Sequence, residues 1–208
     1  MARTKTSKAW MHEHVTDVYV RRAKQDGYRS RSAYKLLEIL DKDKLVRPGM
    51  TVVDLGAAPG GWSQVLAPLV GAKGQVIALD LLEMEPLRGV VVIRGDFSED
   101  STLKLLDQHT GDRSIDLVVS DMAPNISGVG LVDQARSIHL AELALEFSRD
   151  RLKPGGDLIV KVFQGSGLDE FRKALSIAFG SVAVRKPKAS RDRSSEFYLL
   201  ARGKRQVS

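Results

Sequence analysis

The chain has 208 residues, 43% of them hydrophobic, which is enough for one compact hydrophobic core. It has no cysteine, which excludes disulfides and thiolate metal sites and favours a reducing compartment such as the cytoplasm. No apolar run approaches the ~20 residues that span a bilayer, and none follows the basic N-terminus, so we expect neither a membrane span nor a signal peptide.

The net charge of +6 is unevenly distributed. Residues 1–50 hold 12 Lys or Arg against 6 Asp or Glu, residues 51–180 hold 12 against 18, and residues 181–208 hold 8 against 2. Basic ends around an acidic middle favour a polyanion such as nucleic acid, although a solvated surface is the simpler alternative for one basic end alone. With only 6% aromatic residues, an extended base-stacking platform is not expected.

The first part of the chain reads as two helices joined by a basic turn. Residues from about 9 to 25 carry apolar side chains near helical spacing. Apolar side chains from Ala33 to Leu40 indicate the second helix. The turn GYRSRS ends at Ser32, which we expect to be the N-cap of that helix.

From residue 51 onward, expected strands and helices alternate. Strands are expected at about 51–55, 75–80, 90–94, 115–120 and 157–163, and helices at about 62–70, 101–108, 133–151 and 168–178. This alternation predicts an α/β fold with a parallel sheet and helices on both faces. The last two strands, at about 181–186 and 196–202, have no helix between them, which favours a hairpin and an antiparallel final strand.

A glycine-rich loop follows the first strand, within VVDLGAAPGGWS at residues 52–63. Gly56, Gly60 and Gly61 permit a tight turn and a close approach of a ligand to the backbone at the carboxyl edge of the sheet. The spacing is neither the dinucleotide fingerprint G-x-G-x-x-G nor a P-loop. Pro59 also lacks the backbone donor that a pyrophosphate site would use.

The string DLGAAPGGWS resembles the first motif of S-adenosylmethionine (SAM) dependent methyltransferases, and its PGGWS ending is typical of the FtsJ (RrmJ) family of RNA ribose 2′-O-methyltransferases. The resemblance covers essentially the whole chain. It implies a Rossmann-like class I methyltransferase fold, with a seven-stranded, mostly parallel sheet whose last strand is antiparallel. We expect one domain, 1–208, in which a basic helical extension (1–50) precedes the SAM-binding catalytic core (51–208).

Acidic residues at strand ends complete the expected cofactor site. Asp80 lies twenty residues after Gly60, a spacing at which an acid can bind both ribose hydroxyls of a nucleoside. The resemblance implies that Asp96 faces the adenine amino group, and Asp54 is expected to orient the loop or meet the methionine amino group. Each acid taken alone could instead be an N-cap or turn residue. The expected SAM contacts are Asp54, Gly56, Pro59, Gly60, Gly61, Trp62, Asp80, Asp96, Phe97 and Asp121.

The catalytic hypothesis begins with Lys161, inside the apolar strand LIVKVF. A buried lysine is costly unless it is paired, and its position near the end of a central strand favours an active site over an edge-strand lysine that reaches solvent. Asp121 ends one strand, Glu196 begins the last, and Lys35 alone would read as a surface lysine. Together the four match the Lys-Asp-Lys-Glu tetrad of the FtsJ family, within RSRSAYKL, SDMAPN, VKVFQG and SRxRSxE.

A ribose 2′-hydroxyl is a poor nucleophile, so it must be aligned with the sulfonium methyl group and relieved of its proton. We assign Lys161 as the base or as the group that steers the hydroxyl, and Lys35 as a second cation. Asp121 and Glu196 orient these groups. No metal is required, because the leaving group is a neutral thioether.

The two basic ends are expected to bind RNA phosphates. The expected RNA contacts are Arg21, Arg22, Lys24, Arg29, Arg31, Arg185, Lys186, Lys188, Arg191 and Arg193. Within the family the likeness is greatest to bacterial members, which implies a monomer that methylates a uridine ribose of 23S rRNA, in the A-loop of the large ribosomal subunit. Three alternatives stay open: a tRNA-directed member of the family, a small-molecule or protein methyltransferase, and a non-catalytic RNA-binding protein with the SAM fold.

Overall fold

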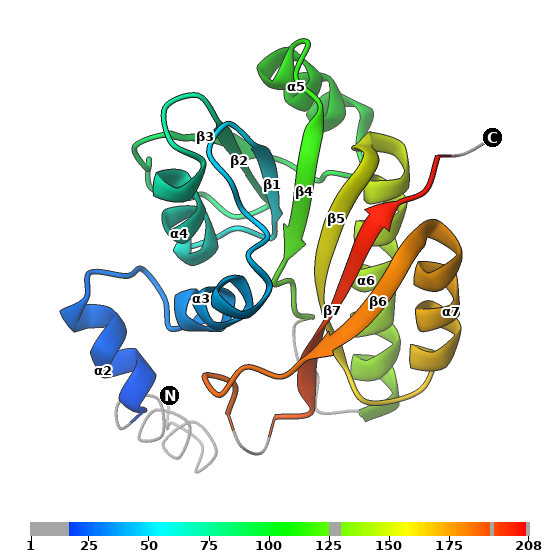
Figure 1. Cartoon of the computed structure of the whole chain (residues 1–208). Helices are drawn as coiled ribbons and strands as arrows, with labels where there is room; N and C mark the ends of the chain where they lie inside the picture. The colour runs from blue at the N-terminus through cyan, green and yellow to red at the C-terminus, as the bar shows by residue number, and fades with distance from the viewer. Residues whose placement is uncertain (1–16, 125–129, 192–193, 207–208) are drawn as a thin grey trace, which may run out of the picture.

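The computed structural model describes residues 17–124, 130–191 and 194–206. In this part of the chain, seven strands form one sheet in the order β3-β2-β1-β4-β5-β7-β6 (Figure 1). The strands are β1 (Thr51–Leu55), β2 (Gln75–Asp80), β3 (Val90–Arg94), β4 (Ile115–Ser120), β5 (Leu152–Phe163), β6 (Phe179–Arg185) and β7 (Glu196–Lys204). β1 to β5 pair in parallel, whereas β7 is antiparallel to both β5 and β6. The expected hairpin and the antiparallel last strand are confirmed.

Helices cover both faces of the sheet, as expected (Figure 1). They are α2 (Val18–Gln25), α3 (Ser32–Asp43), α4 (Gly61–Val70), α5 (Asp100–Thr110), α6 (Gly130–Arg151) and α7 (Leu168–Ala178). Alternate strand residues point to opposite faces, so β1 sends Val52 toward α3 and α4, and Val53 and Leu55 toward the helices of the other face. No helix in the described ranges is long and apolar enough to cross a membrane.

The start of α3 differs from the expectation for Ser32. Arg31 occupies the N-cap position without a side-chain cap, and Ser32 is the first residue of the helix. The Ser32 hydroxyl is hydrogen bonded to the Ser30 hydroxyl at 2.6 Å. Its carbonyl accepts the Trp62 indole N–H at 2.9 Å. The capping prediction was therefore wrong, because Ser32 is already inside the helix and its hydroxyl pairs with the neighbouring Ser30.

Apart from the start of β5, the other described boundaries agree closely with expectation. α2 begins at Val18 and is capped by Asp17, whose Oδ1 accepts the backbone N–H of Tyr19 at 2.9 Å. The part of this expected helix before residue 17 lies outside the described residues. β5 begins at Leu152, earlier than expected, and its pairing with β4 contains a register shift.

One edge of the sheet gathers the groups of chemical interest. Parallel strands place their carboxyl ends at the same edge. Because β7 runs the other way, its first residue, Glu196, pairs with the last residue of β5, Phe163. The end of β5 and the start of β7 therefore lie side by side, close to the loops that follow β1, β2 and β4.

Candidate active site

The glycine-rich loop is tied to its neighbours by hydrogen bonds and close contacts. The backbone N–H groups of Gly56 and Ala57 donate to the Leu79 carbonyl at 2.9 and 3.2 Å, which fixes the loop against β2. Gly56 and Gly60 adopt positive φ angles of 72° and 104°, and a Cβ on Gly60 would lie only 3.0 Å from Arg29 Nη1. Glycine is therefore required here both for conformation and for space.

Asp54 lies beneath this loop with its side chain buried. Its Oδ2 accepts the Ser63 hydroxyl at 2.7 Å, whereas its Oδ1 is buried and has no hydrogen-bond partner among the described residues. Burial, reinforced by the charges of Asp121 and Asp80, raises the pKa of Asp54 from 3.8 to about 7, against the opposing effect of Ser63. A buried oxygen without a donor is suited to a ligand that brings one, such as an amino group.

The next two acids stand at the ends of β2 and just beyond β3. Asp80 accepts the backbone N–H groups of Ala58 and Leu82, each at 2.8 Å, on its two different oxygens. Each oxygen keeps a lone pair, so the partly exposed carboxylate can still accept two hydroxyl groups. Asp96 accepts the backbone and hydroxyl of Ser98 at 2.9 and 2.6 Å, both on Oδ1. Asp96 thus makes a turn, as its alternative reading held, and leaves Oδ2 for a ligand. The acceptor positions left on these two carboxylates suit the hydroxyl and amino groups of the SAM nucleoside.

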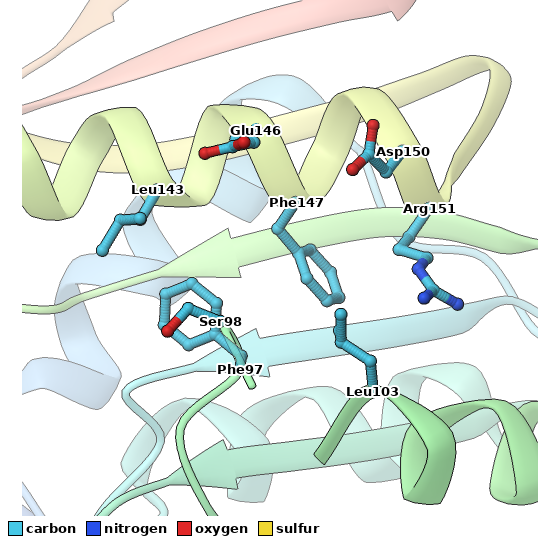
Figure 2. A pocket seen from close by; sticks show the side chains of 8 residues that line it. All are labelled: Phe97, Ser98, Leu103, Leu143, Glu146, Phe147, Asp150 and Arg151. Atoms are coloured by element: carbon cyan, nitrogen blue, oxygen red, sulfur yellow. The ribbon is translucent and has the colours of Figure 1, made fainter. Parts of the chain in front are cut away.

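The two aromatic residues expected at the cofactor both pack against other aromatic rings, Trp62 in the core and Phe97 in a partly buried position. Trp62 is buried and its ring centroid is 5.5 Å from that of Tyr198, so it supports the loop from the core. Phe97 packs edge-on against Phe147, with centroids 6.0 Å apart. Both phenylalanines line a pocket of about 150 Å³ between α5 and α6 (Figure 2). This pocket lies directly behind the turn at Asp96.

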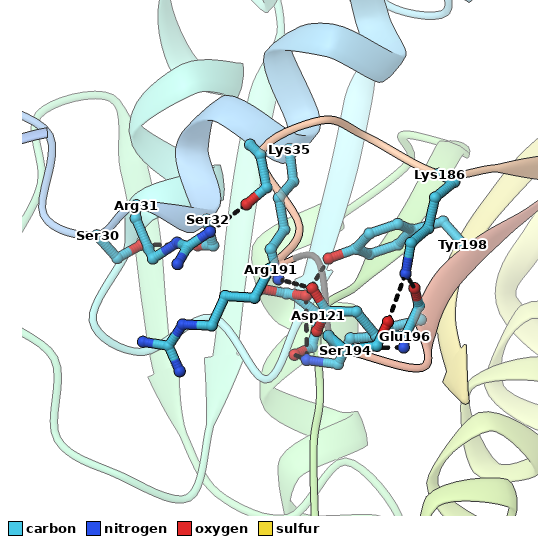
Figure 3. Close-up of polar contacts among 12 residues, drawn as sticks. Ser30, Arg31, Ser32, Lys35, Asp121, Lys186, Arg191, Ser194, Glu196 and Tyr198 are labelled. Carbon is cyan, nitrogen blue, oxygen red and sulfur yellow. Dashed lines mark hydrogen bonds and ion pairs between the residues drawn. The ribbon is translucent and has the colours of Figure 1, made fainter. Parts of the chain in front are cut away.

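The four expected catalytic residues form two buried ion pairs. Figure 3 labels three of the four, Lys35, Asp121 and Glu196. Lys161 Nζ lies 3.1 Å from Asp121 Oδ1 and also donates to the Asp121 backbone carbonyl. Lys35 Nζ lies 2.5 Å from Glu196 Oε1. Both pairs are at least four-fifths shielded from solvent, which meets the requirement that a buried lysine be paired. The structure therefore brings together residues from α3, β5, β7 and the loop after β4.

Tyr198 joins the two ion pairs and was missed by the sequence reasoning. Its hydroxyl donates to Asp121 Oδ1 at 2.7 Å, and its ring centroid lies 5.9 Å from Lys35 Nζ. Burial raises the pKa of this phenol well above its ordinary value, so it remains a neutral donor. A signal existed: Tyr198 is two residues after Glu196 on β7, which puts both on one face, and it pairs directly with Lys161.

Several cations expected at the RNA are engaged within the protein. Arg31 donates to Asp17 and to the Ala189 carbonyl, and Arg191 lies 3.5 Å from Asp17. These contacts hold together the start of α2, the start of α3 and the segment before β7. Arg31 and Arg191 therefore serve as structural links between distant parts of the chain.

Two cations at the end of β6 are engaged in the same way. Arg185 makes two hydrogen bonds with Asp43, at 2.7 and 2.5 Å, and these lower the pKa of the Asp43 carboxyl. Lys186 Nζ donates to the carbonyls of Ser194 (2.7 Å) and Glu196. Lys186 thus holds the backbone that presents Glu196 to Lys35.

The remaining expected RNA contacts are more accessible. Arg22 is exposed, although it pairs with Asp26 at 3.4 Å and lies over the Tyr34 ring at 4.9 Å. Three further cations are exposed and their side chains form no hydrogen bond or ion pair with other described residues: Arg21, Lys24 and Lys188. Arg193 lies outside the described residues. Of the expected RNA contacts, those available for phosphates therefore lie on α2 and at Lys188.

Comparison with known proteins agrees with this geometry. A family model described as FtsJ-like methyltransferase matches residues 28–204. Proteins named ribosomal RNA large subunit methyltransferase E are 60% identical over 205 residues in Nitrosospira multiformis (99% of this chain, 100% of that protein) and 55% identical over 203 residues in Pseudomonas aeruginosa (98% of each). A crystal structure of a Plasmodium falciparum protein named as a ribosomal RNA methyltransferase has a TM-score of 0.78 at 29% identity, covering 86% of this chain and all of that one. The expected class I methyltransferase fold is confirmed, and the chain belongs to the FtsJ-like family of SAM-dependent methyltransferases.

Proposed function

We propose that this chain transfers a methyl group from SAM to the ribose 2′-hydroxyl of a uridine in 23S rRNA, with the A-loop of the large ribosomal subunit as its target and ribosome maturation as its role. The observation that carries the chemistry is the pair of buried Lys–carboxylate contacts, Lys161–Asp121 and Lys35–Glu196, at the sheet edge beside the glycine loop. The substrate rests on the names of relatives that are 55–62% identical over nearly the whole chain.

When bound, SAM supplies a methyl group on a sulfonium and leaves as a neutral thioether, so no metal is needed to stabilise the leaving group. Lys161 Nζ holds the 2′-oxygen and receives its proton, for which it must be in the neutral form. Asp121 holds Lys161 through its carboxylate and its backbone carbonyl. Lys35, held by Glu196, places a positive charge beside the developing oxyanion.

Each of the three acidic cofactor residues binds a different part of SAM. Asp80 accepts the ribose hydroxyls, Asp96 the adenine amino group, and Asp54 the methionine amino group through its unpartnered Oδ1. Gly56, Gly60 and Gly61 give the loop its approach to the ligand. On the RNA side, phosphates are contacted by three of the expected cations whose side chains form no hydrogen bond or ion pair in the described chain, Arg21, Lys24 and Lys188. Residues 1–50 and the core act together as one monomeric enzyme.

The test is labelled-methyl transfer from SAM to naked 23S rRNA, isolated large subunits and tRNA. We expect label in large subunits, with less in naked 23S rRNA and none in tRNA. Label in tRNA alone would establish the tRNA-directed alternative. Absence of label from every RNA, with SAM still bound, would establish a non-catalytic RNA-binding protein. Mass mapping of the labelled fragment identifies the nucleotide.

A further inference from the structure

Arg29 stands among the basic residues of the turn before α3, yet its guanidinium is bound to the protein backbone. Nη1 donates to the carbonyls of Pro59 (3.1 Å) and Glu85 (2.7 Å), and Nη2 donates to the carbonyl of Pro86 (2.8 Å). Pro59 belongs to the glycine loop, whereas Glu85 and Pro86 belong to the segment that follows Asp80. One side chain therefore joins the two segments on either side of the proposed nucleoside site.

The backbone of Arg29 is fixed as firmly as its side chain. Its N–H donates to Gln64 Oε1 at 3.0 Å, and Gln64 Nε2 donates in turn to the Gly27 carbonyl at 2.8 Å. Gln64 lies in the first turn of α4, directly after the glycine loop. The turn before α3 is thus attached to α4 by its backbone and to the loop by the Arg29 side chain.

Packing around Gly60 shows how closely these parts fit. A Cβ on Gly60 would come within 3.0 Å of both Arg29 Nη1 and Met84 Sδ. Met84 is buried against Ala57 of the loop, whereas its neighbours Leu81 and Leu82 are exposed. The segment after Asp80 therefore has few apolar anchors of its own, and Arg29 supplies hydrogen bonds to carbonyls that β2 and β3 do not pair.

We propose that Arg29 is a positioning residue for the SAM site, which holds the glycine loop and the segment after Asp80 at the spacing that SAM binding needs. The proposal rests on the assignment of this loop as the SAM site. It also gives Arg29 a role other than the expected RNA contact, because three of its five N–H donors already serve backbone carbonyls.

Arg29→Lys tests this geometry at constant charge. A lysine is a compact point charge and cannot span three carbonyls as the planar guanidinium does, whereas a phosphate accepts either residue. We expect the Kd of SAM, measured by calorimetry, to rise about tenfold, since loss of positioning loosens the site. RNA affinity should stay within about twofold, and its dependence on salt should not change.

The matched control is Arg88→Lys, at an exposed arginine in the same 81–89 segment whose side chain forms no hydrogen bond or ion pair in the described chain. It should leave both affinities unchanged. Unchanged SAM affinity in folded Arg29→Lys would overturn the proposal. A second result would overturn it too: Arg29→Gln that binds SAM normally but binds RNA more weakly, with a slope of log RNA affinity against log salt smaller by about one. If wild-type protein bound no SAM, the proposed function would fail instead.

Hydrogen exchange on the wild type gives a second test that does not depend on a variant folding. SAM should slow amide exchange in the turn around Arg29, as well as in the glycine loop, because the two are joined. Protection confined to the loop would contradict the proposal.

Discussion

Asp54 makes SAM binding dependent on pH in a calculable way. Its carboxyl is buried and its pKa is raised, chiefly by burial, to about 7, so much of it is protonated in the free protein near neutrality. If Oδ1 accepts the methionine amino group, the bound state requires the ionised carboxylate. Binding at acidic pH must then release the proton, and part of the binding free energy is lost to that step.

The expected size of the pH effect on SAM affinity follows from the pKa of Asp54. At about pH 6 roughly ten of eleven free molecules are protonated, and at about pH 7.5 roughly one in four. The Kd of SAM should therefore be about eightfold higher at about pH 6, equivalent to about 1.2 kcal/mol. Folding stability depends on pH in the opposite direction. Because the pKa of Asp54 is raised in the folded protein, its contribution to the free energy of unfolding is fully present below pH 3.8 and is lost as the pH rises through about 7.

Calorimetry at both pH values, each in two buffers of different ionisation enthalpy, measures the affinity and the protons released. Wild-type protein should release about 0.9 proton per SAM at about pH 6. Asp54→Asn has no carboxyl to titrate, so its affinity should be lower and should change less than about twofold between the two pH values. Equal affinities for wild-type protein at both pH values, or the same pH dependence in Asp54→Asn, would refute the assignment.

Other substitutions separate chemistry, RNA binding and stability. Tyr198→Phe removes the hydrogen bond to Asp121, and we expect kcat in single-turnover assays to fall about tenfold, near 1.4 kcal/mol, with no change in the Kd of SAM. A normal kcat would show that the hydroxyl has no positioning role. Arg21→Gln should weaken RNA binding and reduce the slope of log affinity against log salt by about 0.7–0.9, and an unchanged slope in filter binding would remove Arg21 from the phosphate contacts. Arg185→Gln should instead lower the free energy of unfolding by about 1–2 kcal/mol, because it leaves Asp43 largely buried without its partner. Since the folded pKa of Asp43 is lowered, this difference should be present at neutral pH, begin to fall near pH 3.8 and be lost as the pH falls through the lowered pKa. An undiminished difference below that pKa in urea titrations would contradict the ion-pair explanation.

The sequence was informative wherever periodicity or topology determines position. The strands from 51 to 120 were placed correctly because their apolar runs end at glycine or acidic residues. The antiparallel final strand was predicted from the absence of a helix before it, and in the structure this strand places Glu196 beside the end of β5. Lys161 was predicted to be paired because a charge in an apolar strand must be, and its partner proved to be Asp121.

Contacts between segments far apart in the chain could not be predicted from charge alone. A basic residue bound to an internal carboxylate and one free for phosphate look the same in the sequence, so Arg31 and Arg185 were grouped with Arg21. Ser32 is a different case, because its hydroxyl is engaged locally by Ser30 and only its carbonyl takes part in a distant contact, with Trp62. Tyr198 lies in an apolar run of the sequence, which gives no sign that its hydroxyl has a partner. That partner, Asp121, is identified only from the three-dimensional structure.

The nucleoside composition of large-subunit 23S rRNA after reaction with SAM tests both the chemistry and the target. Wild-type protein should produce one 2′-O-methyluridine per subunit, and folded, SAM-binding Lys161→Ala should produce almost none. A methyl group on a base, or near-normal 2′-O-methylation by Lys161→Ala, would contradict the role that we assign to Lys161 and its ion pair with Asp121.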